Sequence, residues 1–347
     1  MQPYNGGNDP QRGGVYSTGH GFYNPYAEPE WKREKKRIRA AGNGIGLASV
    51  GYVAVSFGAA LFLYAAIGAV NALRGGNFME VGENAQWAVT LITYILSLIM
   101  PFGIYALCIQ MPIGAAFPFR KMRGDITVGG IFVGLGAGIV ASYATSYLEQ
   151  ALGLFGIGIS MPEFEIPTAL SAKIIYIITM TVAPAFIEEM VFRGIVMQSL
   201  RRFGDMFALV SSALIFGIFH LNLIQTPYAF ILGLCIGYFV MRTGSLWVGV
   251  IMHFLNNSIA TVLTLAEPYC SEEMFLFINL AYSLAAVMCG IIALCLLLVK
   301  YRDMFRFGDA PGVLSSGKRA AYFLTSPALI IAMLTAVVLT AQYIEIL

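Results

Sequence analysis

An apolar stretch near the middle of the sequence contains three charged side chains, Glu188, Glu189 and Arg193. Glu189 and Arg193 are four residues apart, so on a helix they lie on one face and can form an ion pair. Glu188 points about 100° away from that face and has no local partner. A carboxylate without a partner inside an apolar helix can serve as a general base or acid. A buried ion pair that only stabilises helix packing is the alternative interpretation.

Two later apolar stretches contain further polar residues at helical spacing. Phe216 and His220 are four residues apart in the first, and His253 and Asn257 are four apart in the second. Each pair therefore lies on one face of its predicted helix. Two plainer interpretations stay open. A buried histidine can bond only a backbone carbonyl, and asparagines in hydrocarbon can join helices by hydrogen bonds.

If these three helices meet, their side chains are suited to hydrolysis of an amide bond. Counted at about 1.5 Å per residue from the helix ends, Glu188, His220 and Asn257 reach similar depths in a membrane. Glu188 and His220 would hold and deprotonate a water molecule. His253 and Asn257 would donate hydrogen bonds to the oxyanion of the tetrahedral intermediate.

The elements that must position these residues are membrane helices. The 347 residues are 58% hydrophobic and 12% charged, whereas roughly a quarter of the residues of a soluble domain are charged. The apolar residues form long blocks, and a membrane helix needs about 20 such residues. The sequence therefore predicts an all-α, polytopic transmembrane helical bundle of about eight to nine spans. The candidate spans are 44–73, 86–112, 127–155, 170–198, 205–222, 225–241, 245–266, 274–299 and 321–344.

The charge distribution predicts the orientation of this bundle in the cell membrane. With nine spans and a cytoplasmic N-terminus, 18 of the 21 Lys and Arg residues fall on the cytoplasmic side, as the positive-inside rule requires. Residues 1–40 are predicted to be a disordered, basic cytoplasmic tail, and 41–347 a helical membrane domain. The basic segment 31–39 is interpreted as an anchor beside the membrane, so no nucleic-acid partner is expected. An eight-span bundle with one end helix on the surface is the alternative.

Three motifs on successive predicted helices resemble those of the CPBP family. This family comprises CAAX prenyl protease type 2 enzymes and bacteriocin-processing (Abi) proteins. The resemblance covers about residues 125–265, the predicted protease-like core. The motifs are Glu188-Glu189-Met-Val-Phe-Arg193, Phe216-Gly-Ile-Phe-His220 and His253-Phe-Leu-Asn-Asn257.

This resemblance implies an intramembrane endopeptidase with Glu188 as the base and His220 as its partner. His253 and Asn257 would form the oxyanion site. Family members are often described as metalloproteases, and zinc would suit Glu188, His220 and His253 as ligands if a metal is bound. The sequence lacks a His-Glu-x-x-His motif, and a glutamate-activated water without a metal is the preferred interpretation. The supporting residues would be Glu189, Arg193 and Phe216.

The predicted partners are the lipid bilayer and a membrane-associated peptide or lipidated protein as substrate. A prenylated CAAX protein, a peptide pheromone and a bacteriocin leader all stay open as substrates. Two functions of other classes also stay open. One is a non-catalytic immunity or scaffold protein of the same fold, and the other is a proton-coupled transporter that uses the intramembrane Glu, His and Arg as a relay.

Overall fold

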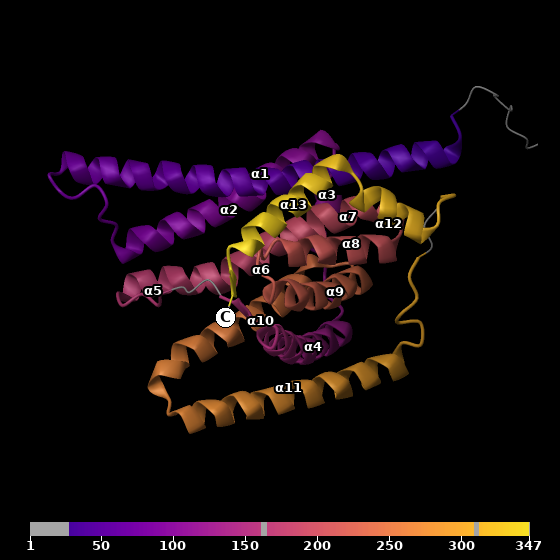
Figure 1. Ribbon diagram of the computed structural model, residues 1–347. Helices are drawn as coiled ribbons and strands as arrows, with labels where there is room; N and C mark the ends of the chain where they lie inside the picture. The colour runs from indigo at the N-terminus through magenta and orange to yellow at the C-terminus, as the bar shows by residue number, and fades with distance from the viewer. Residues whose placement is uncertain (1–27, 161–164, 309–311, 347) are drawn as a thin grey trace, which may run out of the picture.

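The computed structural model describes residues 28–160, 165–308 and 312–346. Within these residues the chain is almost entirely helical, which confirms the predicted all-α class. Helices α1 and α2 cover one side of the bundle, and α11 lies along the opposite side (Figure 1). The helices are α1 (Glu30–Leu73), α2 (Glu83–Cys108), α3 (Ile113–Ala116), α4 (Gly124–Gly153), α5 (Leu170–Ile177), α6 (Ala183–Glu188), α7 (Met197–Leu200), α8 (Asp205–Ile218), α9 (Gln225–Thr243), α10 (Leu246–Ala266), α11 (Glu272–Lys300), α12 (Ser316–Leu324) and α13 (Pro327–Ala341).

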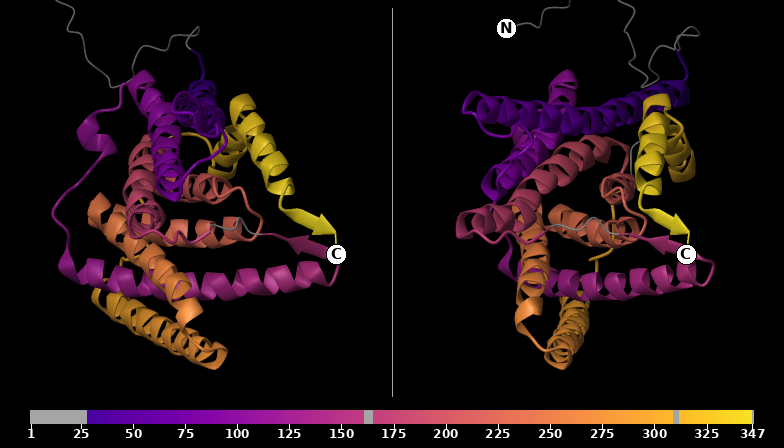
Figure 2. Two further views of the ribbon diagram at one scale, coloured as in Figure 1. Left: turned by 90° about the vertical axis from the view of Figure 1, so that its left-hand side faces the viewer. Right: turned by 60° about the vertical axis from the view of Figure 1, so that its left-hand side comes forward.

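Shorter elements complete the chain. Two π-helical segments, η1 (Ile178–Val182) and η2 (Glu189–Val196), join α5, α6 and α7 into one continuous rod. Single 3-10 turns, η3 (Arg201–Phe203) and η4 (Glu267–Tyr269), follow α7 and α10. Strands β1 (Ile157–Ile159) and β2 (Ile344–Ile346) pair antiparallel, with Ile157 opposite Ile346. This small sheet places the end of α4 beside the C-terminal segment (Figure 2).

Seven helical segments of the described residues are long and apolar enough to cross a membrane. An eighth is added if α12 and α13, which are bent by 67° relative to each other, count as one span. The bend follows from Pro327, which begins α13 and cannot donate a backbone hydrogen bond to the preceding helix. The chain is therefore a multi-pass membrane protein.

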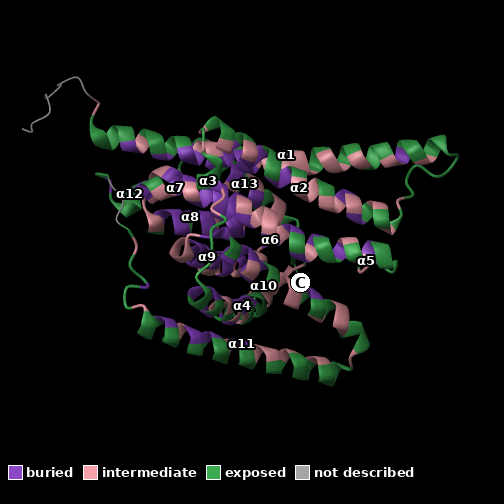
Figure 3. Cartoon of the chain, turned by 180° about the vertical axis from the view of Figure 1, so that it is seen from behind, coloured by how far each residue is buried: buried purple, intermediate pink, exposed green. Residues whose placement is uncertain are grey.

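The predicted span 205–222 is shorter in the structure than in the sequence analysis. Its helix, α8, has 14 residues, a length of about 21 Å, whereas the hydrocarbon core is about 30 Å thick. The helix begins after Gly204, with φ 120°, and Leu221, with φ 51°, lies in the turn that follows it. Much of α8 is buried inside the bundle (Figure 3). Neighbouring helices, rather than lipid, therefore surround most of it.

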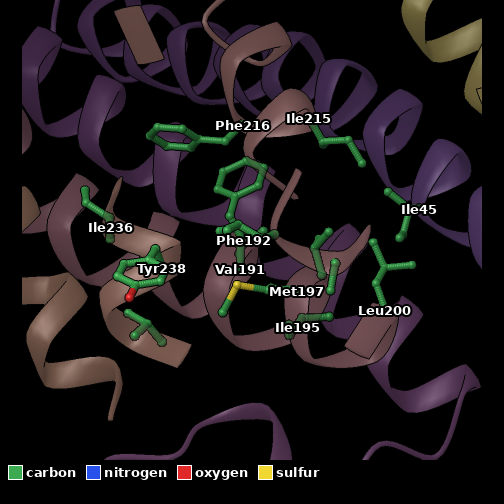
Figure 4. Close-up of a cluster of buried hydrophobic side chains, with 14 of the residues drawn as sticks. Ile45, Val191, Phe192, Ile195, Met197, Leu200, Ile215, Phe216, Ile236 and Tyr238 are labelled. Atoms are coloured by element: carbon green, nitrogen blue, oxygen red, sulfur yellow. The ribbon is translucent and has the colours of Figure 1, made fainter. Parts of the chain in front are cut away.

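A cluster of buried aromatic side chains joins α8 to the rod that contains Glu188. The rings of Phe192 and Phe216 lie 5.2 Å apart, centroid to centroid, in an edge-on arrangement. Figure 4 shows the two rings side by side among the surrounding apolar side chains. Both residues are at most 1% exposed. Such packing gives these two helices a fixed separation, which the polar residues beside them require.

The last part of the predicted disordered tail, 1–40, is helical in the structure. Residues 1–27 lie outside the described residues, but 30–40 form the first turns of α1, so the expectation of disorder is corrected there. Glu34 explains this order, because its carboxylate accepts a hydrogen bond from Arg319 at 2.7 Å. Arg319 also donates to the Phe203 carbonyl at 3.0 Å. The start of α1 is thus tied to α12 and to the end of the rod that contains Glu188.

Helix α1 approaches α13 closely at Gly46. A Cβ placed there would lie within 3 Å of the backbone of Ala328 and Leu329, and backbone atoms cannot move aside as a flexible side chain can. Gly46 therefore permits a contact that no other residue type allows.

Replacing Gly46 by Ala is expected to destabilise the protein by about 1–3 kcal/mol, the usual effect of overpacking. Thermal unfolding in a mild detergent measures this. Gly58 is the matched control, since it lies on the same helix and a Cβ there would meet nothing within 4 Å. Gly58→Ala should not lower the melting temperature. Equal melting temperatures for the two variants would contradict the close α1–α13 contact.

Candidate active site

Glu188 ends α6, between the two π-helical segments of the rod. A π-helical turn inside an α-helix is unusual and often marks a functional site, because it rotates the side chains that follow. Pro184, four residues earlier, has no N–H and cannot donate to the carbonyl of Met180. That carbonyl accepts a hydrogen bond from the Asn257 amide of α10 at 3.3 Å. The irregular backbone thereby connects this rod to α10.

The adjacent Glu189 forms the predicted ion pair with Arg193. The Arg193 Nη1 atom lies 2.8 Å from Glu189 Oε1, and the two side chains are 1% and 0% exposed. The Arg193 guanidinium also lies 4.1 Å from the centre of the Phe216 ring. Phe216 thus contacts the ion pair. The 2.8 Å distance confirms the predicted i, i+4 pairing of Glu189 with Arg193.

His253 extends this ion pair towards Glu188. Its Nδ1 atom lies 2.9 Å from Glu189 Oε1. An ionised carboxylate can only accept, so Nδ1 carries the hydrogen. Its Nε2 atom faces Glu188 Oε2 at 3.7 Å, which is too long for a direct hydrogen bond. Gly249 permits the close approach of α10, because a Cβ there would lie 2.6 Å from Glu189 Oε2.

The two carboxylate oxygens of Glu188 have different surroundings. Oε1 accepts a hydrogen bond of 2.6 Å from the Tyr94 hydroxyl of α2. Oε2 is buried and has no hydrogen-bond partner among the described residues. A buried carboxylate oxygen without a hydrogen-bond partner is energetically unfavourable in a folded protein. It can, however, accept a proton from a water molecule that reaches it beside His253.

Tyr94 is the site residue that sequence reasoning missed. It lies outside the predicted core of about 125–265, on a helix for which the sequence predicted a membrane span and no part of the site. A signal was present, because Thr90, Thr93, Tyr94 and Ser97 recur at helical spacing within an apolar segment. Such a polar stripe inside a membrane span indicates a face that contacts something other than lipid.

His220 lies in the turn after α8, and its predicted role of holding a water molecule with Glu188 stays a prediction. Its Nδ1 atom lies 2.9 Å from the Phe216 carbonyl, and since a carbonyl only accepts, Nδ1 is the donor. In the neutral ring the Nε2 atom then holds the free lone pair. The structure shows no hydrogen bond between His220 and Glu188 in the part of the chain that it describes. The Phe216 ring contacts both imidazoles, with centroids 5.0 Å from His220 and 5.9 Å from His253.

Asn257 is held away from Glu188 in this arrangement. Its amide nitrogen donates to Met180, and its amide oxygen accepts from Asn256 at 3.2 Å. Asn256 in turn accepts from the Tyr228 hydroxyl at 2.9 Å. The predicted donation of hydrogen bonds by His253 and Asn257 to one oxyanion stays a prediction, and in this arrangement the Asn257 amide donates to Met180 instead.

The ligand set expected for a metal is not assembled. Among the described residues, no cluster of three or more His, Cys, Asp or Glu side chains is arranged to hold a metal ion. The Nδ1 atoms of both His220 and His253 are engaged by other groups. Both Nε2 atoms remain free of hydrogen bonds to the described residues, as they are in histidines that ligate a metal through Nε2. The proposal below uses protein groups alone.

The surrounding sequence matches a known family. Residues 170–259, from the start of α5 into α10, match the model described as type II CAAX prenyl endopeptidase Rce1-like. This segment is narrower than the expected 125–265, yet it includes all three predicted motifs, whereas Tyr94 lies outside it. No curated protein and no solved structure matches the chain. The chain therefore contains, at residues 170–259, an Rce1-like domain of the type II CAAX prenyl endopeptidase (CPBP/Abi) family.

Proposed function

We propose that this protein is an intramembrane endopeptidase that hydrolyses a peptide bond with a water molecule activated by Glu188. The observation that carries the proposal is the buried Glu188 Oε2 atom, which lacks a partner among the described residues and faces His253 Nε2. A base needs one free oxygen aimed at the place where water and substrate meet. The family match supports the same activity and a protein substrate.

In the proposed reaction, Glu188 Oε2 takes a proton from a water molecule as the oxygen attacks the substrate carbonyl carbon. The Tyr94 hydroxyl holds Oε1, so Oε2 is the oxygen that acts. Glu188 then returns the proton to the leaving amine as the C–N bond breaks. The carboxylate is thereby regenerated, and both products carry the atoms of the water.

The negative charge on the tetrahedral oxyanion needs a donor. His253 Nε2 can supply it when the ring is protonated, since Nδ1 is already engaged by Glu189. The Glu189–Arg193 pair fixes the orientation of this ring. His220 Nε2 offers a lone pair to the attacking water, and Asn257 would join the oxyanion site only after leaving Met180. The site residues are thus proposed as Glu188, His220, His253 and Asn257, supported by Glu189, Arg193, Phe216 and Tyr94.

The test is cleavage by the purified wild-type protein, in detergent, of farnesylated CAAX peptides and of unmodified hydrophobic peptides. We expect cleavage of at least one class, and unchanged rates after treatment with a chelator. Loss of cleavage with the chelator and its return with zinc would overturn the metal-free mechanism. A folded protein that cleaves no peptide would overturn the proposed function.

Replacing Tyr94 by Phe is expected to lower kcat about 10- to 100-fold, because the change removes one hydrogen bond to a charged carboxylate, worth about 1.5–3 kcal/mol. KM should change little, since the phenol contacts Glu188 rather than the scissile bond. Steady-state kinetics on a cleaved peptide measures both constants. Tyr143→Phe is the control, because Tyr143 is exposed on α4. Equal kcat values for the two variants would contradict the role of Tyr94.

We also propose that the N-terminus is cytoplasmic. In the predicted nine-span arrangement 18 of the 21 Lys and Arg residues lie on one side, which supports this orientation. Cysteine-accessibility labelling of a Cys placed at Ser17 tests it. Labelling from the outside of intact cells would contradict the orientation.

A further inference from the structure

A groove runs between α1 and α2 on the face of the bundle that the family match leaves out. Both helices precede residue 170, where the matched segment begins. The groove has a volume of about 250 Å³. Figure 1 shows the two helices separating towards the turn that joins them. Its lining residues are Tyr52, Ser56, Ala60, Tyr64, Val89, Thr90, Thr93, Tyr94 and Ser97.

The lining is uncharged and rich in hydroxyl groups, which seven of these nine residues carry. Some of the hydroxyls are already bonded to their own helix, as Thr90 is to Gln86. The Thr93 hydroxyl is different, because it is buried and has no partner among the described residues. A buried hydroxyl without a partner costs about 1–3 kcal/mol, so it indicates a ligand that would accept or donate a hydrogen bond there.

The groove borders the candidate active site at Tyr94. This side chain lines the groove and donates its hydroxyl hydrogen to Glu188 Oε1. Anything bound in the groove next to Tyr94 is therefore within one side chain of the proposed base. Tyr52 also connects the groove to the site, because its ring lies 4.7 Å from the ring of Phe219, the residue before His220.

The length of the groove suits a short extended chain. Tyr52 and Tyr64 are 12 residues apart on α1, a separation of about 18 Å along the helix. An extended polypeptide rises about 3.3 Å per residue, so about five residues would fill this length. A polypeptide backbone offers a carbonyl or an N–H at every residue, and these match a row of hydroxyls. An acyl chain of the same length would leave the buried Thr93 hydroxyl without a partner.

We propose that the α1–α2 groove binds an extended, uncharged segment of the polypeptide substrate and leads it to Glu188. The proposal rests on the proposed endopeptidase function and adds where the part of the substrate away from the cleaved bond is held. Specificity for uncharged residues in that segment follows, because a charge would have no partner in the groove.

The first measurement uses variants that fill or alter the groove. Ala60→Phe should raise KM about tenfold or more for long peptides and leave kcat nearly unchanged, because the new ring occupies the groove but not the site. The effect should disappear for peptides shortened, from one end, by about five residues. Ala54→Phe is the matched control, since Ala54 is on the same helix but exposed.

Removing the unpaired hydroxyl is a gentler change. Thr93→Val should raise KM about threefold to tenfold, the effect of one neutral hydrogen bond. Thr335→Val is its control, because that hydroxyl already donates to Ile331 on α13. Unchanged KM in Thr93→Val and Ala60→Phe, with the wild type active, would overturn the groove and leave the proposed function intact.

The second measurement does not depend on cleavage. A photo-crosslinking phenylalanine analogue placed at Ala60 or at Ala54 is irradiated, in lipid nanodiscs, with a biotinylated uncharged peptide of about ten residues. We expect peptide adducts at position 60 and not at 54. Adducts at 60 from a protein that cleaves nothing would support the groove while the protease activity fails. Lipid adducts alone at 60, with the peptide in excess, would overturn the groove.

Discussion

Glu188→Gln is expected to lower kcat about 10²- to 10⁴-fold, the usual contribution of a general base. Glutamine keeps the shape of the side chain and can still accept the hydrogen bond from Tyr94. It cannot take a proton from water at Oε2. KM should therefore change little, and the melting temperature should not fall, because a carboxylate without a full set of partners is replaced by a neutral amide.

The measurement is steady-state cleavage of a peptide that the wild type cleaves, with the melting temperature determined in the same detergent. Glu149→Gln is the control, since Glu149 is an exposed carboxylate on α4 and should retain wild-type kinetics. If Glu188→Gln retains more than about a tenth of the wild-type kcat, the base is another group. In that case Glu188 would serve only the hydrogen bond with Tyr94.

The local parts of the site could be predicted because they depend on helical spacing alone. The i, i+4 rule placed Glu189 against Arg193 before any tertiary structure was known, and the 2.8 Å contact confirms it. The same rule placed Phe216 beside His220, whose ring lies 5.0 Å away and whose Nδ1 bonds the Phe216 carbonyl. Both results follow from the geometry of one helical turn.

The contacts between helices could not be predicted from spacing. The bond from Tyr94 to Glu188 joins residues 94 positions apart, and only the packing of α2 on α6 creates it. The same holds for His253, whose contact with Glu189 joins residues 64 positions apart. Pro184 and the π-helical turns determine which neighbouring helices Glu188 and Glu189 contact, since they set the rotation of these side chains about the helix axis. Periodicity arguments assume a regular α-helix and miss such a change.

The part of the fold that could be predicted is the set of helices that cross the membrane, because each of them needs a long apolar segment. Long apolar segments predicted the all-α bundle, and the structure contains seven or eight such helices among the described residues. The exception is α8, which is surrounded largely by protein and so need not match the membrane thickness. Hydropathy cannot distinguish an apolar helix buried in a bundle from one that faces lipid. The helical start of α1 was missed for a different reason, because it depends on Arg319 near the other end of the chain.

The largest expected effect on stability comes from Arg193. Arg193→Leu leaves the fully buried Glu189 carboxylate with a hydrogen bond from His253 and without the guanidinium that neutralises its charge. Removing one member of a buried ion pair typically costs about 3–5 kcal/mol, because the remaining charge stays in a low dielectric. The change also removes the guanidinium that packs on Phe216. We expect a large drop in melting temperature and a reduced yield of folded protein.

Two further variants separate the charge effect from a packing effect. Arg201 forms an ion pair with Asp205 at the same i, i+4 spacing and 2.7 Å, but the two side chains are 38% and 25% exposed. Arg201→Leu should therefore cost only about 0–1 kcal/mol.

The double change Glu189→Gln with Arg193→Met removes both buried charges and should recover most of the lost stability. It should not recover cleavage, because His253 Nδ1 then faces a neutral amide and loses the carboxylate that accepts its hydrogen and orients its ring. If the double variant is as unstable as Arg193→Leu, the loss is one of packing and not of an unpaired charge. If instead it is stable and active, the Glu189–Arg193 pair serves the fold alone and His253 acts without it.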